Sequence, residues 1–432
     1  MQVSEALRYT VFFAVDAVRG GAVRRHIRDI DDLLSDPERN ASVNARRLAQ
    51  LLRHACEGTG FYARHRGTTS IQDFPVITKR QISTSYDAFV SRAYRGQRLD
   101  AVTTSGSYGT PFTFHLSREK AARRRAEVIF FGRWAGYEVG KRHAYIRVTN
   151  TKRGLTLFLQ NQILMDPRRI DAGWLARYRE TLRRERVGTV IGYPSAMRVL
   201  AQYCHDEGDT PDSFRLRNFI ATGEPFDSDS RALIERVFGC TAISRYSTEE
   251  FGVLAHECPE EKRHHINTAS YLVELLAPDS DRPVLPGEVG RIVVTDLFSH
   301  AMPLIRYDTG DLGTLADGPC PCGRASPVLA ALGGRQIESV YDAQGRLISP
   351  FAINGAMRDL HDVVQFQFIQ QATARYDLKL CVKSYYQSEP IIRQRLHAIL
   401  GKTSYLNIEY VDDIPALPSG KRPYIMNVQA RG

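Results

Sequence analysis

The chain has no apolar run as long as the roughly twenty residues that a membrane-spanning helix needs. The best candidate, from Tyr9 to Val15, ends at Asp16. Only a lone Arg8 precedes it, rather than the basic segment that begins a signal peptide. We therefore expect a cytoplasmic protein without a membrane partner.

Cysteine is scarce, with seven residues in 432 and no regular spacing between them. This usage argues against a disulfide framework and indicates reduced thiols. We expect four of the seven to be small core residues. These four are Cys56, Cys204, Cys240 and Cys381.

A recognisable motif for reading nucleic acid is also lacking. The formal charge of +10 could attract nucleic acid, but the basic residues lie in segments such as 118–133 and 177–186, where acidic residues interrupt them. We interpret these segments mostly as solvated helix faces, with attraction of anionic nucleotides as a secondary effect. We expect no nucleic-acid partner.

The apolar patterning predicts an α/β fold. At 43% hydrophobic residues, a chain of 432 can bury a substantial core and form two or three structural units. Helical spacing dominates as far as about Leu99, and β-rich runs then alternate with helical ones to about Leu332, which predicts mainly parallel strands. The expected strands include residues 145–148, 187–191, 219–222 and 290–294.

A smaller α+β unit is expected after a glycine hinge at Gly333 and Gly334. Its expected strands lie near 366–370, 378–382 and 408–411, and its expected helix lies around 391–400. The sequence thus predicts a large domain over residues 1–334 and a small domain over residues 335–432. No internal repeat or low-complexity tract interrupts this division.

One loop combines glycine with hydroxyl side chains. It reads Thr103-Thr104-Ser105-Gly106-Ser107-Tyr108-Gly109-Thr110-Pro111. Glycine permits close approach and positive φ, so such a loop lets backbone amides and hydroxyls surround phosphate oxygens. Alone the pattern is a weak signal, since most stretches of this kind are solvated loops.

Two further motifs accompany the loop, Tyr307-Asp308-Thr309-Gly310-Asp311 and Pro418-Ser419-Gly420-Lys421. The three occur in the order and rough spacing of the adenylate-forming ligases. The chain resembles the phenylacetate–CoA ligase-like branch of that family, which includes capsular-polysaccharide proteins. The resemblance covers nearly the whole chain and implies an ATP-dependent, AMP-forming reaction in a large adenylation domain, with a small C-terminal domain that carries a catalytic lysine.

The resemblance also implies where ATP binds. The expected nucleotide-binding residues are Thr104, Ser105, Gly106, Ser107 and Gly109 at the β- and γ-phosphates, Gly223, Glu224 and Tyr246 at the adenine, and Asp311 and Arg335 at the ribose or phosphates. In the family, the aspartate that corresponds to Asp311 accepts hydrogen bonds from both ribose hydroxyls, a task that suits an ionised carboxylate.

The expected catalytic residues are Lys421, Glu250 and Thr248. By the resemblance, Lys421 lies between the substrate carboxylate and the α-phosphate, where a fixed positive charge stabilises the charge that develops as pyrophosphate leaves. Thr248 would face the α-phosphate or the substrate. Glu250 would hold Mg²⁺, which prefers oxygen ligands. Both residues belong to the segment Tyr246-Ser247-Thr248-Glu249-Glu250-Phe251-Gly252, whose alignment with the family pattern is open by one residue, so Glu249 stays an alternative.

Three cysteines and nearby histidines suggest a metal. Cys320-Pro321-Cys322-Gly323 reads as a knuckle-like turn, and Cys258 lies upstream, near His264 and His265. Thiolates with an imidazole form a closed tetrahedral set that suits Zn²⁺, and relatives in the resembled branch carry similar spacing. We expect a structural zinc held by Cys258, Cys320, Cys322 and either His264 or His265. His256 is a weaker alternative for the fourth ligand.

The expected activity is adenylation of an aryl or other small organic acid, followed by acyl transfer to coenzyme A or to an amine. Tyr193-Pro194-Ser195-Ala196 is expected to line the acid pocket, but nothing in it fixes the substrate. Two alternatives stay open: activation of an oxyanion other than a carboxylate, and a binding protein on a ligase scaffold that has lost catalysis. Tyr108 and Ile337, which depart from the family pattern, keep the second alternative open. A homodimer is a further open alternative.

Overall fold

A computed structural model describes most of the chain. The described residues are 4–103, 113–147, 154–167, 170–335, 340–345, 347–348, 352–353, 356–357, 360, 362–415 and 424–428. The predicted site residues Thr104, Ser105, Gly106, Ser107, Gly109 and Lys421 lie outside them, as do Tyr108 and Ile337, the two departures from the family pattern. Among the helices that the structure does describe, none combines the length and apolar character that crossing a bilayer requires.

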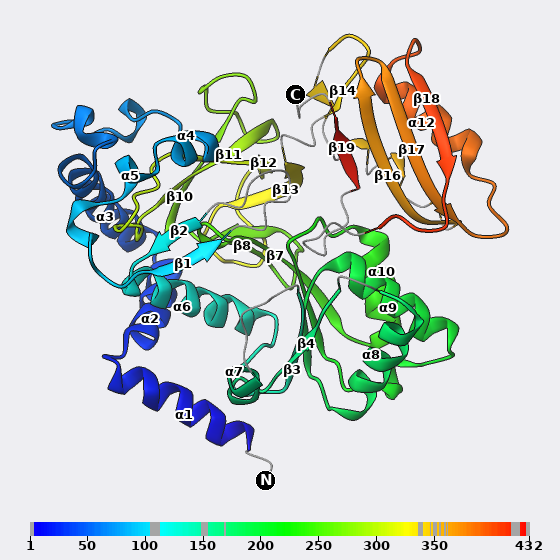
Figure 1. The fold of residues 1–432 in the computed structure, drawn as a ribbon, viewed down its shortest axis with the longest axis horizontal. Coiled ribbons are helices and arrows are strands. Elements are labelled where there is room, and N and C mark those ends of the chain that lie inside the picture. The colour runs from blue at the N-terminus through cyan, green and yellow to red at the C-terminus, as the bar shows by residue number, and fades with distance from the viewer. Residues whose placement is uncertain are drawn as a thin grey trace.

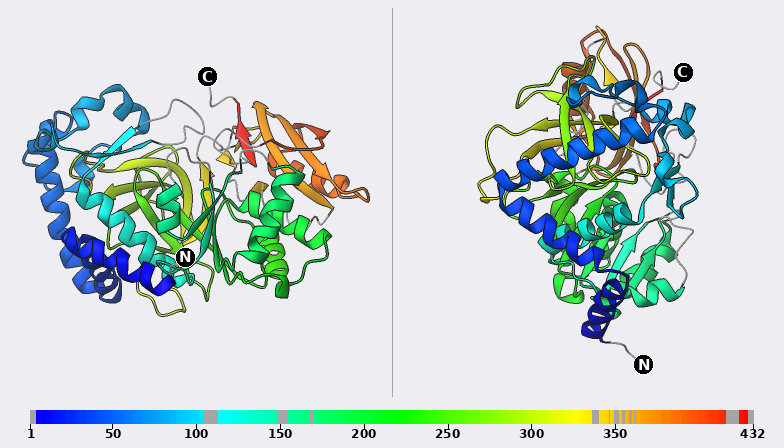
Figure 2. Two further views of the ribbon diagram at one scale, coloured as in Figure 1. Left: turned by 60° about the horizontal axis from the view of Figure 1, so that its bottom comes forward. Right: turned by 90° about the vertical axis from the view of Figure 1, so that its left-hand side faces the viewer.

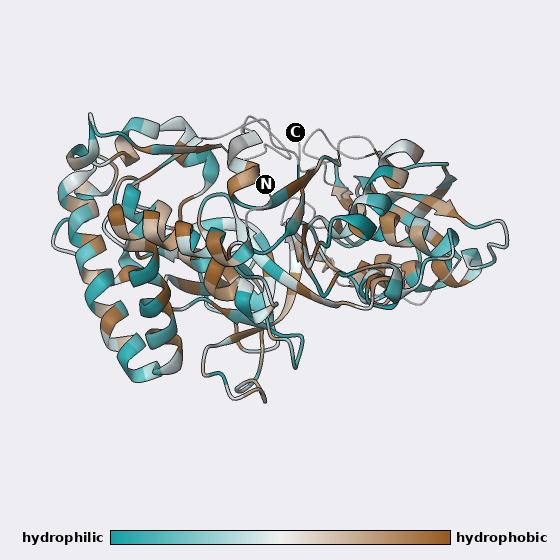
Figure 3. Cartoon of the chain, turned by 90° about the horizontal axis from the view of Figure 1, so that it is seen from below, coloured by the Kyte–Doolittle hydropathy of each residue, from teal (hydrophilic) through white to brown (hydrophobic). Residues whose placement is uncertain are grey.

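The N-terminal region is helical, as the sequence predicts. Its three longest helices are α1 (Glu5–Val18), α2 (Ala22–Ser35) and α3 (Pro37–Gly58). Asp36 begins α3, because its side chain accepts a hydrogen bond from the Arg39 amide and Pro37 occupies the first helical position. Brown and teal bands alternate along the long helices in Figure 3, as expected of helices that pack on one side.

Short elements connect these helices to the body. They are η1 (Tyr62–His65), η2 (Ile71–Asp73), α4 (Lys79–Thr84), α5 (Tyr86–Phe89), η3 (Arg92–Tyr94), and the hairpin of β1 (Asp100–Thr103) with β2 (Thr113–Leu116). The predicted phosphate loop joins the two strands of that hairpin. Ile77 forms a parallel bridge with Tyr307, which ties the N-terminal region to the Tyr307 motif.

The body is built on one sheet, in which the described residues form eleven strands in the order β10-β11-β12-β13-β9-β8-β7-β6-β5-β3-β4 (Figure 1). In chain order they are β3 (His143–Ile146), β4 (Gln162–Met165), β5 (Thr189–Gly192), β6 (Asn218–Thr222), β7 (Thr241–Thr248), β8 (Gly252–Glu257), β9 (His264–Ile266), β10 (Tyr271–Leu276), β11 (Val289–Asp296), β12 (Tyr307–Leu315) and β13 (Val328–Arg335).

Parallel pairing holds for one half of this sheet only. Strands β4, β3, β5, β6 and β7 run parallel, whereas β7 to β13 pair antiparallel. Helices connect the parallel strands, namely α7 (Gly154–Leu159), α8 (Ala172–Arg184), α9 (Pro194–Asp206) and α10 (Ser228–Phe238). The expectation of mainly parallel strands is thus too broad, because no described helix crosses over between β7 and β13 and direct connections favour antiparallel neighbours.

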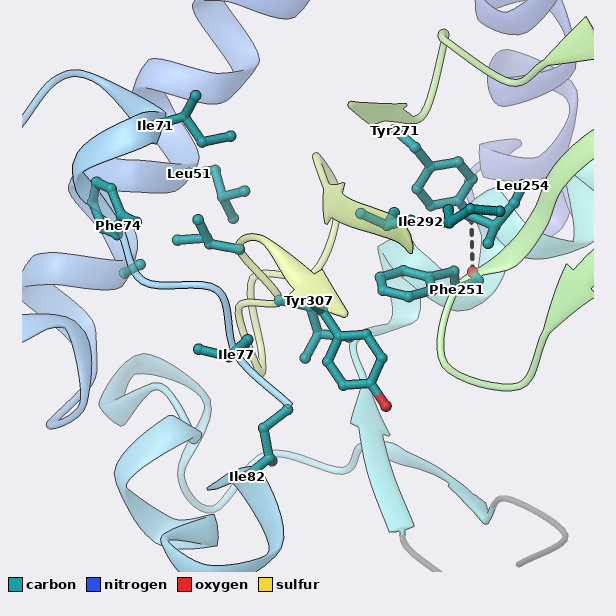
Figure 4. Packing of buried hydrophobic residues seen from close by; sticks show 14 of the residues in the cluster. Leu51, Ile71, Phe74, Ile77, Ile82, Phe251, Leu254, Tyr271, Ile292 and Tyr307 are labelled. Atoms are coloured by element: carbon teal, nitrogen blue, oxygen red, sulfur yellow. Dashed lines mark hydrogen bonds between the residues drawn. The ribbon is translucent and has the colours of Figure 1, made fainter. Parts of the chain in front are cut away.

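The two halves of the sheet have separate cores. Helices α8, α9 and α10 lie beside the parallel strands (Figure 1), where Val190 and Phe219 pack with Leu200 and Ile234. On the antiparallel half, the N-terminal helices share a core with the strands. Figure 4 shows Leu51 and Phe74 in this core, with Phe251, Tyr271 and Tyr307 nearby.

The helix α6 (Arg118–Trp134) corrects one sequence-based interpretation. We expected the basic residues of segment 118–133 to be mostly solvated, but the Lys120 side chain is 1% exposed and that of Arg123 is 0% exposed. Acidic residues that are distant in the sequence, Asp296 and Asp29, pair with them. The second basic segment, in α8, is more exposed, with 79% of the Arg184 side chain accessible.

The C-terminal sheet agrees with the predicted α+β pattern. It has the order β18-β17-β16-β19 and lies at the opposite end of the molecule from α1 (Figure 2). Its elements are β16 (Val363–Ala372), β17 (Arg375–Val382), α12 (Glu389–Leu400), β18 (Tyr405–Tyr410) and β19 (Ile425–Asn427), preceded by the short strands β14 (Val340–Tyr341) and β15 (Leu347–Ile348). Phe368, Leu378, Ile392 and Leu396 form part of its core. Strand β19 was not predicted.

Candidate functional site

The predicted nucleotide motifs meet at the carboxyl ends of the parallel strands. Thr222 ends β6, and Thr248 ends the neighbouring β7. The Thr222 and Ser247 hydroxyl oxygens lie 3.0 Å apart, which joins the two strand ends. In open α/β sheets, ligands bind at this edge.

The Tyr246 hydroxyl connects the expected adenine and ribose sites. It donates a hydrogen bond to Asp311 Oδ2 at 2.6 Å and lies 3.5 Å from Thr309 Oγ1. Gly310, with φ of 73°, lies where the register of β12 against β11 is irregular, and the Asp311 amide donates to Thr309 Oγ1 at 3.1 Å. The carboxylate of Asp311 is therefore fixed beside Tyr246, which is itself only 8% exposed.

Glu250 lies on the tight turn between β7 and β8. The Phe251 amide donates to Thr248 Oγ1 at 3.2 Å, and the Tyr307 hydroxyl lies 3.4 Å from Glu250 Oε1. The rings of Phe251 and Tyr307 pack with centroids 5.5 Å apart. Thus Glu250 and Thr248 share one turn, and the Tyr307 motif contacts it.

Glu249, the alternative carboxylate, has different partners. Arg147 Nη2 lies 2.7 Å from Glu249 Oε1, and Arg124 Nη2 lies 3.6 Å from Glu249 Oε2. Two guanidinium groups thus neutralise the Glu249 carboxylate, which argues against Glu249 as the ligand of a cation.

The loop after β6 contains Gly223 and Glu224. Gly223 has φ of 83°, a conformation that glycine adopts without strain. Glu224 Oε2 accepts a hydrogen bond of 3.1 Å from the Ser195 amide in the first turn of α9. A carboxylate is favourable at a helix N-terminus, so Glu224 fixes this loop against the expected acid-binding segment.

Arg335, the last residue of β13, lies directly opposite Asp311 in the ladder of β12 and β13. The backbone therefore brings these two predicted ribose-site residues together.

Four of the predicted metal ligands gather in one place. The ligand atoms of Cys258, His265, Cys320 and Cys322 all lie within 4.8 Å of one another. Cys322 Sγ is 3.3 Å from His265 Nε2, and Ser326 Oγ lies 2.9 Å from His265 Nδ1. With Nδ1 bonded to the serine, Nε2 is directed at the thiols, as in metal sites where a second partner orients the imidazole.

The structure selects His265 between the two adjacent histidines. Successive side chains of a strand point to opposite faces, so only one of His264 and His265 can face the cysteines from β9. The Nε2 atom of His264 is buried without a hydrogen-bond partner among the described residues. His256 does not belong to the cluster; its ring stacks on Phe131 with centroids 5.8 Å apart, and its Nδ1 lies 3.0 Å from the Glu257 carbonyl oxygen.

The donor set fits Zn²⁺ chemically. Three sulfurs and one imidazole nitrogen make a closed tetrahedral site of a common structural type. Burial and a hydrogen bond to Glu260 raise the pKa of Cys258 to about 12, so that thiol is neutral at pH 7 without a cation. Arg324 Nη1 lies 3.7 Å from Cys258 Sγ and 2.9 Å from Glu260 Oε2, which adds positive charge at the site.

The other four cysteines are core residues, as predicted. Cys56, Cys204, Cys240 and Cys381 are buried free thiols. Burial raises the pKa of Cys204 and of Cys240 to about 12, which makes neither a reactive thiol.

Sequence analysis missed a group of buried polar residues beside Glu250, of which Lys120, Glu127 and Tyr271 are the main members. A signal was present, because charges of both signs occur at Lys120, Arg123 and Glu127, a spacing that puts them on one helix face. Three alanines lie between these charged residues, and the apolar run Val128-Ile129-Phe130-Phe131 follows directly, which is unusual for a solvated helix.

Comparison with known proteins relates the chain to CapK and to phenylacetate-coenzyme A ligase. A family model described as the CapK C-terminal domain matches residues 340–428. A phenylacetate-coenzyme A ligase of Thermus thermophilus is 28% identical over 256 residues, which cover 53% of this chain and about half, 56%, of that relative. Protein CapK of Staphylococcus aureus is 22% identical over 83% of this chain and 80% of its own length.

Solved structures confirm the expected fold class. 2-Hydroxyisobutyryl-CoA ligase in the postadenylation state with 2-HIB-AMP superposes with a TM-score of 0.74 at 20% identity, over 91% of this chain and 90% of that chain. In its thioesterification state the score is 0.60. ATP-bound MatB from Rhodopseudomonas palustris gives 0.56 at 18% identity, over 74% of this chain and 66% of that chain. The chain is thus similar in sequence to phenylacetate-coenzyme A ligases and to CapK, and it shares the fold of CoA ligases of the adenylate-forming family.

Proposed function

We propose that the protein is an ATP-dependent, AMP-forming ligase that adenylates a small organic acid and transfers the acyl group to coenzyme A. The observation that supports this most strongly is the meeting of separate motifs, in which Tyr246 bonds Asp311 and Tyr307 reaches Glu250. Relatives named as coenzyme A ligases favour coenzyme A over an amine as the acceptor.

The nucleotide would bind across these motifs. Asp311 accepts the ribose hydroxyls, and the ring of Tyr246 lies against the adenine with its hydroxyl fixed by Asp311. The loop at Gly223 and Glu224 lines the adenine. Arg335 and the loop from Thr104 to Gly109 complete the contacts to ribose and phosphates, a role that rests on the family resemblance.

Bond formation would occur beside Thr248. A carboxylate oxygen of the acid attacks the α-phosphorus, the bond to pyrophosphate breaks, and Lys421 stabilises the charge that spreads over the transferring group. In the second step the acceptor thiol attacks the acyl carbon, and AMP leaves with the bonding electrons. No side-chain nucleophile is needed in either step.

Glu250 would hold Mg²⁺ together with phosphate oxygens of ATP. A single carboxylate suits this ion, which is commonly shared between one or two carboxylates and substrate phosphates. When bound, Mg²⁺ neutralises part of the phosphate charge. Glu249 is unsuited to this role because its carboxylate is paired with Arg147 and Arg124.

We also propose that residues 335–432 form a domain that brings Lys421 to the nucleotide. This segment has its own sheet and its own core, which includes Phe368, Leu378 and Leu396. We assign Cys258, His265, Cys320 and Cys322 to a structural Zn²⁺ that joins the end of β8 to the segment before β13.

The assay that tests the function combines the purified protein with ATP, Mg²⁺ and a panel of aryl and short aliphatic acids, with coenzyme A, an amine, or neither. We expect acid-dependent pyrophosphate release, and a thioester only when coenzyme A is present. Amide formation in preference to the thioester would contradict the proposed acceptor.

Asp311→Asn tests the ribose assignment. The substitution keeps the shape but removes the charge and replaces one acceptor by a donor, so ATP affinity should fall about tenfold or more, given the cost of losing hydrogen bonds to a charged group. Calorimetric titration with ATP measures the change. Asp317→Asn is the matched control, because Asp317 is an exposed aspartate just after β12. Equal ATP affinity of both variants would show that the site is placed wrongly.

A further inference from the structure

A cluster of buried polar side chains lies directly behind the Glu250 turn. Helix α6 supplies Lys120 and Glu127, and Tyr271 and Asp296 come from β10 and β11. Their residues are between 0% and 1% exposed. Lys120 Nζ forms an ion pair of 2.6 Å with Asp296 Oδ2.

Tyr271 is the centre of this cluster. Its hydroxyl lies 2.8 Å from the Phe251 carbonyl oxygen and 3.0 Å from each carboxyl oxygen of Glu127, and Lys120 Nζ donates to it at 3.0 Å. Figure 4 shows the Tyr271 ring beside Phe251 and the hydrogen bond between them. Phe251 directly follows Glu250, so the cluster is hydrogen-bonded to the backbone next to the proposed metal ligand.

Glu127 also binds the backbone just after Phe251 by a hydrogen bond. The Val253 amide donates to Glu127 Oε2 at 3.1 Å. Gly252 has φ of 124°, and a Cβ atom placed there would lie 2.4 Å from Glu127 Oε2. The carboxyl group therefore packs directly on the chain just after Glu250, at a position that only glycine can occupy.

Each of these short contacts between oxygen atoms also needs a hydrogen between the two oxygens. Tyr271 has one hydroxyl hydrogen, but its oxygen faces two acceptors, the Phe251 carbonyl and the Glu127 carboxyl group. Both contacts carry a hydrogen if Glu127 is a neutral acid whose Oε1 donates to Tyr271, while Tyr271 donates to Phe251. Burial raises the pKa of Glu127, in agreement with this arrangement, although Lys120 and Arg123 act in the opposite direction.

The buried cluster and Glu250 also border the same cavity. Lys120 and Glu250 both line one small cavity, together with His115 of β2 and Ser117, the residue that caps the start of α6. The buried cluster thus meets Glu250 at this cavity as well as through the backbone of Phe251, Gly252 and Val253.

We propose that Tyr271, braced by Glu127 and Lys120, is a positioning residue that fixes the turn carrying the Mg²⁺ ligand Glu250. This inference rests on the proposed function, because it takes Glu250 as the ligand. Residues behind a metal ligand that orient it are typically worth about 10- to 100-fold in metal affinity.

The test measures Mn²⁺ binding to the full-length protein in the presence of ATP by electron paramagnetic resonance, with no acid added. In Tyr271→Phe, the affinity for Mn²⁺ should fall by about tenfold, whereas ATP binding measured with chelator present should be unchanged. Glu127→Gln should bind Mn²⁺ as the wild type does, because the amide can accept from Val253 and donate to Tyr271, as the neutral acid does. Tyr376→Phe is the control for loss of a buried hydroxyl, since Tyr376 bonds Tyr341 within the C-terminal sheet.

The outcomes separate this inference from the proposed function. If Glu250→Gln leaves Mn²⁺ affinity unchanged, the assignment of the metal ligand is wrong, and the positioning role fails with it. If Glu250→Gln weakens Mn²⁺ binding but Tyr271→Phe only lowers the melting temperature, as Tyr376→Phe does, the positioning role is overturned and the ligand assignment stands. Weakened binding in Glu127→Gln would overturn the hydrogen-bond chain.

Discussion

Lys421→Ala should slow adenylate formation by about 10²- to 10³-fold, the usual cost of removing one preorganised group that stabilises transition-state charge. ATP affinity should change little, because an interaction confined to the transition state appears in the rate and not in ground-state binding. Single-turnover pyrophosphate release and calorimetric titration with ATP measure the two quantities separately.

The matched control is Lys402→Ala, which removes an exposed lysine from the proposed C-terminal domain. It should retain the wild-type rate, because loss of one surface charge changes neither the site nor the fold. If Lys421→Ala releases pyrophosphate as fast as the wild type, for an acid shown to bind, then Lys421 has no part in adenylation.

Cys322→Ser should remove the bound zinc and destabilise the fold by about 4 kcal/mol or more, an effect of the size that loss of a structural metal produces. Metal analysis of the wild type purified without chelators should find one zinc per chain. The variant should show lower zinc content and a lower melting temperature, while the fraction that stays folded still forms the adenylate.

Cys240→Ser is the matched control, because Cys240 is a buried thiol in a separate core. It should lose some stability, since a hydroxyl replaces a thiol in an apolar site, but keep its zinc. The zinc assignment would be contradicted if the wild type contained no zinc and Cys322→Ser left its stability unchanged. Residues 320–323 would then be an ordinary surface turn.

The zinc site should also release its metal on acidification. The cysteines bind as thiolates, and burial with the Glu260 contact raises the pKa of Cys258 to about 12 when no metal is present. Zinc binding therefore displaces a proton from Cys258, and falling pH returns that proton and weakens the binding. Zinc release followed with a colorimetric chelator should increase steadily as the pH is lowered.

The sequence predicted secondary structure best where the apolar residues follow a clear periodicity. The strands at residues 219–222 and 290–294 and the helix at 391–400 lie within observed elements, because periodicity and chain order determine them. The antiparallel half of the sheet was not foreseen, since apolar runs of strand length look alike in both kinds of sheet. Pairing direction depends on the connections.

The parts of the site that the sequence did not predict also depend on contacts between distant segments. His264 and His265 are equivalent in the sequence, and only their alternation along β9 shows which one faces the cysteines. Lys120 and Arg123 appeared to belong to a solvated face because their partners, Asp296 and Asp29, are far away in the chain. Contacts of this kind become visible only when the sheet and α6 are packed together.

The central claim is that the protein joins an acid to AMP, and acid-dependent exchange of labelled pyrophosphate into ATP tests it most directly. The exchange requires reversible formation of the adenylate but no acceptor, so it does not depend on the choice between coenzyme A and an amine. We predict exchange that requires Mg²⁺ and a particular acid and is lost in Lys421→Ala. A protein that binds ATP and the acid but exchanges no label would contradict the account and favour a ligase scaffold that has lost catalysis.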